Sequence, residues 1–429
     1  KLQIIKSKAV IMAAGGLGRL YEPTTNALIC TGDGISLAYR AGAPLIDMEM
    51  VQYHPTTLKS NGVLITEAAR GEGAYLLNSK GERFMEKYAP NMMELASRDV
   101  VSRAEQTEIN EGRDVDGCVL LDLRHLGREK IHERLSYINE VSMDFLGIDL
   151  AEAPVPVRPG MHYQMGGIKT DVDGATIVPG LYAAGECACV SVHGGNRLGA
   201  NSLLSCIYTG LMMSPGGLNY INNLPEAAED IPESVYSASV KKWQESYANI
   251  KSMNGKENPY ALHREMAEEM ISNVLIVREN SKLKSTLDKI DEFESRWKNI
   301  KCVDTSDWSN PVPSFINQLW NMIQLSKIIT KGALLRDEFR GSHYKPEFDL
   351  HQPDDFRPET YLEFEKQKED GQIKEDEFSP DHLAYMKRFS KNNIKWLKTT
   401  IATYRNGGPE ISYEAVDTSL IDPRPRKYD

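Results

Sequence analysis

Cationic side chains recur in short stretches bounded by glycine or proline, although the 429-residue chain has a net charge of −11. Two of them are the histidines His54 and His162, and three are the arginines Arg70, Arg98 and Arg197. An arginine fork binds a carboxylate through two parallel hydrogen bonds, and an imidazole can donate a further one. These residue types are therefore suited to enclosing a small dianion.

Each of these residues also has a structural interpretation, which stays open when the residue is taken alone. A histidine can be a hydrogen-bonded core residue, and an arginine can form a structural ion pair. The dianion site is favoured because the stretches flank a single region, 46–167, and because Thr66 adds a hydroxyl donor close to Arg70.

Composition excludes several classes of protein. Apolar residues make up 41% and charged residues 26% of the chain, which is ordinary for a globular protein with a sizeable core. No apolar run approaches the roughly 18 residues that a membrane-spanning helix needs. The acidic charge balance disfavours a nucleic-acid partner, because binding phosphates requires a basic face.

The six cysteines are too few for a disulfide scaffold in a chain of this length. Only Cys187 and Cys189 are close together, and a single Cys-x-Cys lacks the second pair that a zinc or iron–sulfur site needs. We therefore expect free thiols and no metal site, with any iron–sulfur clusters on another chain.

Periodicity and glycine turns predict how the chain is organised. An α/β pattern in the first 45 residues stops and then returns, which indicates an inserted domain. Ligands in such folds bind where the insertion meets the carboxyl ends of the strands. The predicted parts are an α/β segment (1–45), a mixed insertion (46–167), the α/β return (168–220), a helical domain (221–335) and a small C-terminal domain (336–429).

Individual elements are expected within these parts. The apolar run 9–14 fits a buried parallel strand, and 177–186 fits a second strand that leads toward a helix start at Asn201. The other predicted elements are a helix near 93–111, three packed helices at 237–249, 258–279 and 314–335, a helix around 380–393 and a strand at 395–404.

Glycine-rich turns follow the expected strands, as at Gly15-Gly16 and Gly32. Such turns let backbone N–H groups approach a ligand closely, and their repetition favours a nucleotide or dinucleotide cofactor. No Gly-x-Gly-x-x-Gly follows an N-terminal strand, and the chain opens directly into a core strand. We therefore expect that a first segment is missing.

Ordered motifs along nearly the whole chain resemble those of the flavoprotein subunits of succinate dehydrogenase and fumarate reductase. The resemblance implies an α/β fold with additional helices: a Rossmann-like FAD-binding domain, an inserted α+β capping domain, a three-helix-bundle domain and a small C-terminal domain. The matching motifs are His54-Pro55-Thr56, Thr66-Glu67-x-x-Arg70-Gly71-Glu72-Gly73, Arg83-Phe84-Met85, Arg98-Asp99-Val100-Val101, His162-Tyr163-x-Met165-Gly166-Gly167-Ile168, Ala184-Gly185-Glu186, His193-Gly194-x-Asn196-Arg197-Leu198-Gly199-x-Asn201-Ser202-Leu203-Leu204 and Pro423-Arg424-Pro425-Arg426-Lys427-Tyr428.

By this resemblance, FAD is the cofactor and succinate and fumarate are the substrates. Family members begin with a strand–GxGxxG–helix unit and mostly carry a histidine bonded to FAD, and this sequence has neither. The implied FAD contacts are therefore limited to Gly15, Gly16, Asp33, Glu186, Asn201, Ser202 and Leu203.

The resemblance also assigns substrate roles. His162 and Arg197 are implied to hold one carboxylate, and His54 and Thr66 the other.

For proton delivery, the resemblance implies Arg98, connected to solvent through Glu67 and Arg70. A guanidinium rarely gives up its proton, so a purely electrostatic role for Arg98 stays open beside the proton-shuttle role.

Electrons must leave reduced FAD, and this chain has no cluster motif. The resemblance therefore implies partner subunits: an iron–sulfur subunit and, through it, a quinone-reactive membrane anchor. The chain would be peripheral, on the cytoplasmic face of a bacterial inner membrane or on the mitochondrial matrix face.

Three other interpretations of the sequence compete with this one. L-aspartate oxidase shares the fold and several motifs, but the stretch from Glu186 to Gly194 fits the succinate/fumarate type better. Adenylylsulfate reductases share the cofactor fold without the dicarboxylate set. The third alternative is an inactive, flavin-free fragment or scaffold that docks on an iron–sulfur subunit.

Overall fold

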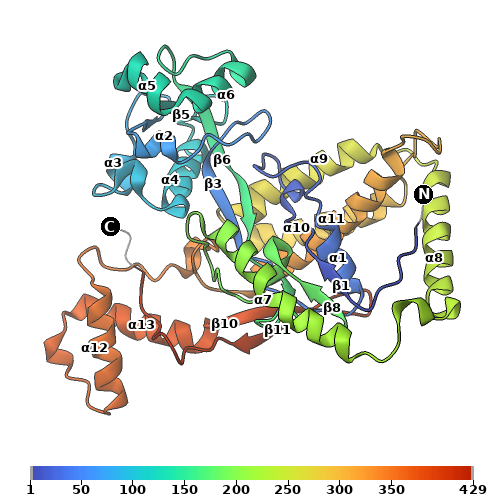
Figure 1. The fold of residues 1–429 in the computed structure, drawn as a ribbon. Helices are drawn as coiled ribbons and strands as arrows, with labels where there is room; N and C mark the ends of the chain where they lie inside the picture. Colours follow the sequence, from blue (N-terminus) through green and yellow to red (C-terminus); the bar gives the residue numbers. More distant parts are fainter. Residues whose placement is uncertain (1–2, 427–429) are drawn as a thin grey trace. The chain divides into compact units, whose positions relative to one another are not determined.

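The computed structural model describes residues 3–426, which divide into two compact units (Figure 1). Unit 1 consists of Lys1–Gln52, Gly160–Leu335 and Thr400–Ser412, and unit 2 consists of Tyr53–Pro159, Arg336–Thr399 and Tyr413–Asp429. The α/β fold with additional helices is confirmed, while the five predicted sequence parts stay predictions. Lys427 and Tyr428 of the closing motif lie outside the described residues.

Unit 1 contains a parallel pair of strands, β1 (Val10–Met12) and β8 (Leu181–Ala183). Both strands were expected from the sequence, and the parallel pairing brings segments 171 residues apart into register, with Val10 opposite Leu181. The expected burial of β1 is wrong for the described residues, because Val10 is 50% and Ile11 56% exposed. A strand with one parallel neighbour leaves its other edge and its faces uncovered.

A second sheet has the order β11-β10-β2-β7-β9. Its short strand β2 pairs antiparallel with both β10 and β7, and β7 pairs parallel with β9. This sheet therefore joins segments from the beginning, the middle and the end of the chain. The strands are β2 (Leu45–Ile46), β7 (Gly167–Lys169), β9 (Ala188–Cys189), β10 (Lys398–Arg405) and β11 (Gly408–Ala415).

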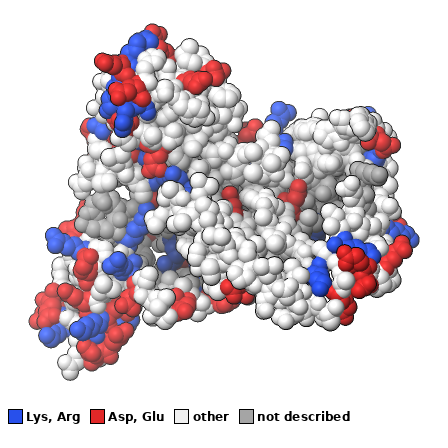
Figure 2. Space-filling model, in the orientation of Figure 1, with Lys and Arg blue, Asp and Glu red and all other residues white. Residues whose placement is uncertain are grey.

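Helix α7 (Asn201–Asn223) has an unusually exposed apolar surface. It contains no charged residue, and in Figure 2 the surface over it is uncharged. Leu203 is 73% exposed, and Met213 is its only buried residue within the described chain. Exposed apolar patches of this kind are typical of surfaces that a ligand or another polypeptide segment covers.

The helical part of unit 1 packs around α11 (Val312–Leu335), whose buried residues include Ile316, Leu319 and Ile323. Three helical segments were expected here, and the structure adds a further helix. This additional helix is α10 (Asn280–Trp297), a mostly charged segment whose narrow apolar face consists of Leu283, Ile290 and Phe293. The helices are α8 (Glu233–Ser252), α9 (Pro259–Met270), α10 (Asn280–Trp297) and α11, with a π-turn at Ile271–Leu275.

Helix α9 shows how the local sequence sets a boundary. The side chain of Asn258 accepts hydrogen bonds from the backbone N–H groups of Tyr260 and Ala261, and Pro259 occupies the first turn. An asparagine cap followed by proline is a strong signal for a helix start.

Unit 2 contains a sheet of order β3-β6-β5-β4, covered by short helices (Figure 1). Strands β4 and β5 pair antiparallel, as do β5 and β6. Buried residues of the sheet and of α4, such as Leu76, Val101 and Leu121, form one core. The elements are β3 (Val51–Thr57), α2 (Ala68–Gly71), β4 (Tyr75–Leu77), α3 (Met85–Tyr88), α4 (Arg98–Asn110), β5 (Val119–Asp122), α5 (Arg128–Arg134), α6 (Ser136–Leu146) and β6 (Val155–Gln164).

The C-terminal part of unit 2 has its own aromatic core, in which Phe356, Tyr361 and Tyr385 are buried. This core lies between α12 (Pro358–Glu369) and α13 (Pro380–Trp396). The sequence predicted α13 and β10 but not α12. Among residues 3–426, we find no helix that combines the length and the apolar character needed to cross a membrane.

Helix α4 also supplies a test of stability. Hydrogen bonds from Arg113 lower the pKa of the buried Glu108 carboxyl to about 2. A depressed pKa adds stability above the unfolded pKa, and this stability is lost as the pH falls from about 4.3 toward 2. We expect Glu108→Gln to lower the free energy of unfolding at pH 7 by about 1–3 kcal/mol. Denaturant titrations at pH 7 and pH 3 would check this, and an equal loss at both pH values would contradict it.

Candidate functional site

A carboxylate in unit 2 is held by two arginines. The Nε and Nη2 atoms of Arg98 donate to Oε2 of Glu67 at 3.0 and 2.8 Å. Nη2 of Arg70 lies 3.7 Å from the other oxygen, Oε1. Arg98 is the first residue of α4 and Arg70 lies on α2, so two helices place guanidinium groups around one glutamate.

Arg70 differs from Arg98 in its surroundings. Its side chain is 1% exposed, and its Nη1 donates to the backbone oxygen of Glu94. Burial lowers the pKa of the Arg70 guanidinium, and the charge of Glu67 partly opposes that effect. Glu67 is half exposed, so this group of three side chains runs from solvent to a buried cation.

His54 and Thr66 come together in the same unit through backbone pairing. His54 lies buried on β3, and its Nδ1 accepts from the backbone N–H of Thr56 at 3.3 Å. The backbone of Thr56 in turn accepts from the N–H of Ile65 at 2.9 Å, which places the segment bearing Thr66 beside the strand. The Thr66 hydroxyl accepts from Ala68 N–H at 3.2 Å and keeps its proton for donation to a ligand.

Arg197 is the central cation of unit 1. Its Nη2 donates to Oε1 of Gln52 at 2.8 Å, and the guanidinium carbon lies 4.5 Å from the ring centroid of Tyr163. Gln52 also donates to the Arg197 backbone oxygen at 2.7 Å. These contacts orient a nearly buried guanidinium, which suits carboxylate recognition.

His162 lies on β6 in the same unit. Its Nδ1 lies 2.8 Å from the hydroxyl oxygen of Thr25, and its backbone oxygen accepts from the side chain of Asn26 at 2.9 Å. The contact at Nδ1 orients the imidazole.

Two site residues were not assigned from the sequence. Nε2 of His193 lies 3.2 Å from the Tyr163 hydroxyl and 3.1 Å from that of Ser205. Burial and the nearby charge of Arg197 lower the pKa of His193 to about 4, so its imidazole is neutral at pH 7. Gln52 is the second residue that was not assigned. The only sequence signals were positional: His193 lies just before Arg197, and Gln52 lies just before His54.

The glycine turn of unit 1 closely approaches an acidic residue. A Cβ added at Gly16 would lie 2.3 Å from Oε1 of Glu186. That oxygen accepts from the backbone N–H of Gln164 at 3.0 Å, and burial raises the pKa of Glu186. Gly15 and Gly185 both have positive φ, at 70° and 72°, so both turns use backbone conformations that favour glycine.

Comparison with known proteins decides what these groups belong to. Residues 1–203 match the FAD binding domain and residues 263–428 the C-terminal region of the fumarate reductase flavoprotein. The succinate dehydrogenase flavoprotein subunit of Bacillus subtilis is 39% identical, over 100% of this chain and 68% of that protein. The chain belongs to the succinate dehydrogenase/fumarate reductase flavoprotein family.

Other members of this family agree with the assignment. The 8-methylmenaquinol:fumarate reductase flavoprotein subunit of Wolinella succinogenes is 40% identical, over 80% of this chain and 57% of that protein. A solved structure of Escherichia coli quinol fumarate reductase superimposes with a TM-score of 0.81 at 32% identity, covering 97% of this chain and 66% of that one. The chain thus spans between about half and two thirds of the length of these relatives.

FAD is the cofactor of this flavoprotein family, and the described residues fit part of its site. The close approach of Gly16 to Glu186 forms a narrow cradle beside a carboxylate that can accept from sugar hydroxyls. The predicted contacts Asn201, Ser202 and Leu203 form the first turn of α7, whose backbone N–H groups have no partner within the helix. The N–H of Asn201 donates to the backbone oxygen of Leu198 at 3.3 Å.

Asp33, also predicted to lie beside the cofactor, is engaged within the protein. Its carboxylate accepts from the Thr31 hydroxyl at 3.0 Å and from the Asn321 side chain at 2.7 Å. It begins α1 (Asp33–Arg40) and ties that helix to α11. Its contact with FAD stays a prediction, as do those of the other residues assigned by resemblance.

No group of three or more His, Cys, Asp or Glu side chains positioned to hold a metal ion occurs within residues 3–426. The described cysteines are all free thiols.

A test of the flavin cradle follows from its tight geometry. We expect Gly16→Ala to displace Glu186 and to reduce FAD retention at least about tenfold, because the added Cβ would overlap the carboxylate. The flavin-to-protein absorbance ratio after gel filtration measures this. Gly42→Ala is a matched control with no heavy atom within 4 Å of the added Cβ, although its positive φ adds strain. Equal FAD loss in both variants would show that the cradle is not specific.

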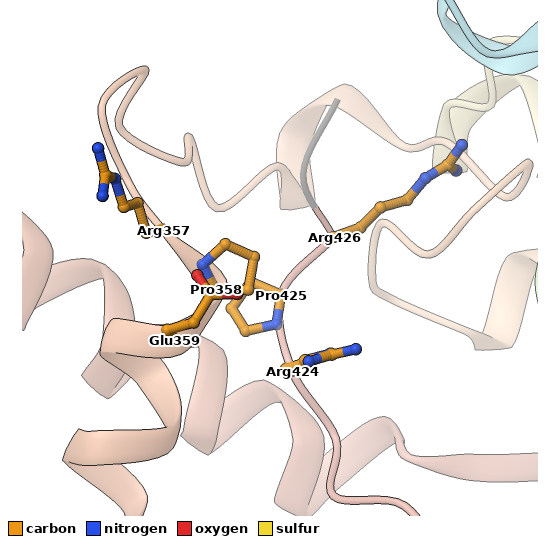
Figure 3. Close-up of a pocket in the computed structure, with 6 residues that line it drawn as sticks. All are labelled: Arg357, Pro358, Glu359, Arg424, Pro425 and Arg426. Atoms are coloured by element: carbon orange, nitrogen blue, oxygen red, sulfur yellow. The ribbon is translucent and has the colours of Figure 1, made fainter. Parts of the chain in front are cut away.

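A separate cavity of about 640 Å³ lies in unit 2 at the start of α12. Figure 3 shows that Arg357 and Arg426 point away from each other, so the arginines do not converge on a common ligand. Arg426 instead forms an ion pair with Asp99 at 3.2 Å. None of the predicted site residues lines this cavity.

Proposed function

We propose that this chain is the catalytic flavoprotein subunit of an enzyme that interconverts succinate and fumarate. The observation that carries the proposal is the Glu67 carboxylate, hydrogen-bonded twice by Arg98 and flanked by the buried Arg70. An alkene conjugated to a carboxylate needs both charge stabilisation and a proton at carbon when it is reduced, and this group can supply both.

Two pairs of residues are proposed to bind the two carboxylates of the substrate. His162 and Arg197 are proposed to hold one carboxylate. His54 and Thr66 are proposed to hold the other. The oriented guanidinium of Arg197 supplies bidentate contacts, and the imidazole and hydroxyl groups supply directional donors.

Arg98 is proposed to deliver a proton to the substrate carbon in fumarate reduction and to accept one in succinate oxidation. Glu67 reprotonates it through the two hydrogen bonds already formed, and the half-exposed carboxylate exchanges protons with solvent. Burial lowers the pKa of the neighbouring Arg70, whose guanidinium lies 3.7 Å from the same Glu67 carboxylate. FAD, when bound, supplies the two-electron chemistry that amino-acid side chains lack.

Partner subunits complete the proposal. Relatives are named as subunits of quinol-linked fumarate reductases and succinate dehydrogenases. We propose that this chain likewise passes electrons to an iron–sulfur subunit and through it to a quinone-reactive membrane anchor. It would then be peripheral, on the cytoplasmic face of a bacterial inner membrane or on the mitochondrial matrix face.

The test uses the FAD-loaded protein without oxygen. Adding succinate is expected to bleach the flavin absorbance, and adding fumarate afterwards is expected to restore it. L-aspartate is the discriminating control, since bleaching by aspartate alone would support the aspartate oxidase alternative. Protein without bound flavin, or flavin unresponsive to succinate, would support the inactive scaffold instead.

A further inference from the structure

Helix α4 carries a buried polar row behind the proposed proton-delivery group. Arg98, Ser102 and Glu105 are spaced four and three residues apart, which places them on one face of the helix. Glu105 is fully buried, and neither of its carboxyl oxygens has a hydrogen-bond partner. The buried hydroxyl of Ser102 also lacks one. Buried polar groups without a hydrogen-bond partner are rare in folded proteins, so their presence needs a physical explanation.

Arg70 is the charged group that acts on Glu105 from another element. Their charges influence each other's pKa, although no hydrogen bond joins them. The Nε and Nη2 atoms of Arg70 have no hydrogen-bond partner, and Nη2 lies 3.7 Å from Glu67. Arg70 therefore interacts electrostatically with two carboxyl groups, the buried one of Glu105 and the half-exposed one of Glu67.

Several other charged groups on α4 and on the elements packed against it form ion pairs or hydrogen bonds of their own. Arg70 is the cation whose charge acts on Glu105. These pairs are Glu94 with Arg83, Asp99 with Arg103, Glu108 with Arg113 and Tyr88, and Asp122 with Arg124.

Burial raises the pKa of the Glu105 carboxyl well above its ordinary value, and the positive charge of Arg70 opposes this only in part. Burial without a hydrogen-bond partner at either carboxyl oxygen likewise favours the neutral, protonated form of Glu105. When Glu105 is neutral, Glu67 is the carboxylate that attracts the Arg70 guanidinium. An ionised Glu105 would compete with Glu67 and attract Arg70 toward itself.

We propose that Glu105 is a positioning residue: as a neutral acid behind Arg70, it keeps this guanidinium aligned with Glu67 and so holds Glu67 against Arg98. Loss of the Glu105 proton to solvent would draw Arg70 away from Glu67. The effect on turnover rests on the proposed function, but the protonation state of Glu105 does not.

The first test reads the carboxyl group itself. Infrared difference spectra of wild type against Glu105→Gln, at neutral pH, are expected to show a protonated carboxyl band that the variant lacks. Glu108→Gln is the matched control, since Glu108 is equally buried on the same helix but is ionised by its arginine partner. Absence of the protonated band in wild type would overturn the inference whatever the enzyme's activity.

The pH dependence of stability gives a second readout of the same state. A raised folded pKa stabilises the protein below the unfolded pKa of about 4.3, and this stability is lost as the pH rises above it. Glu105→Gln is expected to remove that decline, so the unfolding midpoint of the variant should rise relative to that of the wild type as the pH rises. The unfolding midpoint of Glu108→Gln should show no such relative rise. A constant difference between Glu105→Gln and wild type across the pH range would overturn the inference.

Turnover supplies the readout for positioning. Wild-type fumarate reduction is expected to fall at alkaline pH as Glu105 ionises, while Glu105→Gln keeps at high pH the rate that it has at neutral pH. Glu105→Asp should restore the alkaline fall. If the infrared band is present but no variant turns over succinate or fumarate, the proposed function fails and the state of Glu105 stands. If Glu105→Gln and wild type have identical pH profiles, the positioning role is wrong.

Discussion

Arg98→Lys is expected to lower kcat for fumarate reduction at least about 10²-fold, the scale of a lost general acid. Lysine keeps the positive charge but cannot reproduce the two hydrogen bonds from Nε and Nη2 to Glu67, so the reprotonation step is broken. Steady-state rates with a reduced viologen dye as electron donor measure the effect.

Arg103→Lys is the control for Arg98→Lys. Arg103 lies on the same helix and forms an ion pair with Asp99 at 3.1 Å, outside the proposed proton route. We expect its kcat to stay within about twofold of wild type, because lysine keeps a positive charge beside the buried Asp99 and the pair does not touch Glu67. Near-wild-type kcat and an unchanged pH profile in Arg98→Lys would favour the electrostatic role over the proton shuttle.

Arg197→Met is expected to lower kcat/KM for succinate by about 10²- to 10³-fold, with most of the loss in KM. Removing one partner of a buried, charged hydrogen-bonded pair costs about 2–5 kcal/mol, or roughly 30- to 5,000-fold, and the expected loss lies in the middle of that range. The methionine keeps the volume and the contact with Tyr163 but loses every N–H donor.

The control for Arg197→Met is Arg40→Met, which removes another guanidinium of unit 1. Arg40 donates to Ser36 and Asn321 and has no assigned part in binding. It should lose stability with kcat/KM within about twofold of wild type. If Arg197→Met raised KM no more than Arg40→Met, Arg197 would not be a substrate ligand.

Much of the fold could be predicted from local pattern. The apolar run before Gly15 and the segment ending at Glu186 each predicted a strand, because continuous apolar runs followed by glycine are typical of parallel strands. Their pairing as β1 and β8 was not predicted and is seen only in the structure. Helix α10 was not predicted because most of its residues are charged or polar, and only Leu283, Ile290 and Phe293 form its buried apolar face. Helix α12 was missed for a similar reason, since only Tyr361 and Phe364 are buried.

Site residues were predictable where a motif carries them and not where the fold creates their environment. Arg98 and Glu67 were predicted by resemblance, and the structure joins them in one ion pair. Glu105 has no sequence signal, because a glutamate on a helix is usually exposed. Its burial beside Arg70 depends on how α2 and α4 pack, which no local pattern specifies.

Calorimetric titration of fumarate into the oxidised, FAD-loaded protein tests the central claim most directly, because bound fumarate does not react with oxidised flavin. His54→Ala changes a residue of unit 2, and Arg197→Met changes a residue of unit 1. We predict one saturable site in the wild type and at least about tenfold weaker binding in each variant, as expected when charged hydrogen bonds to one ligand are lost. Unchanged affinity in either variant would contradict the claim that His54 and Arg197 bind the same dicarboxylate.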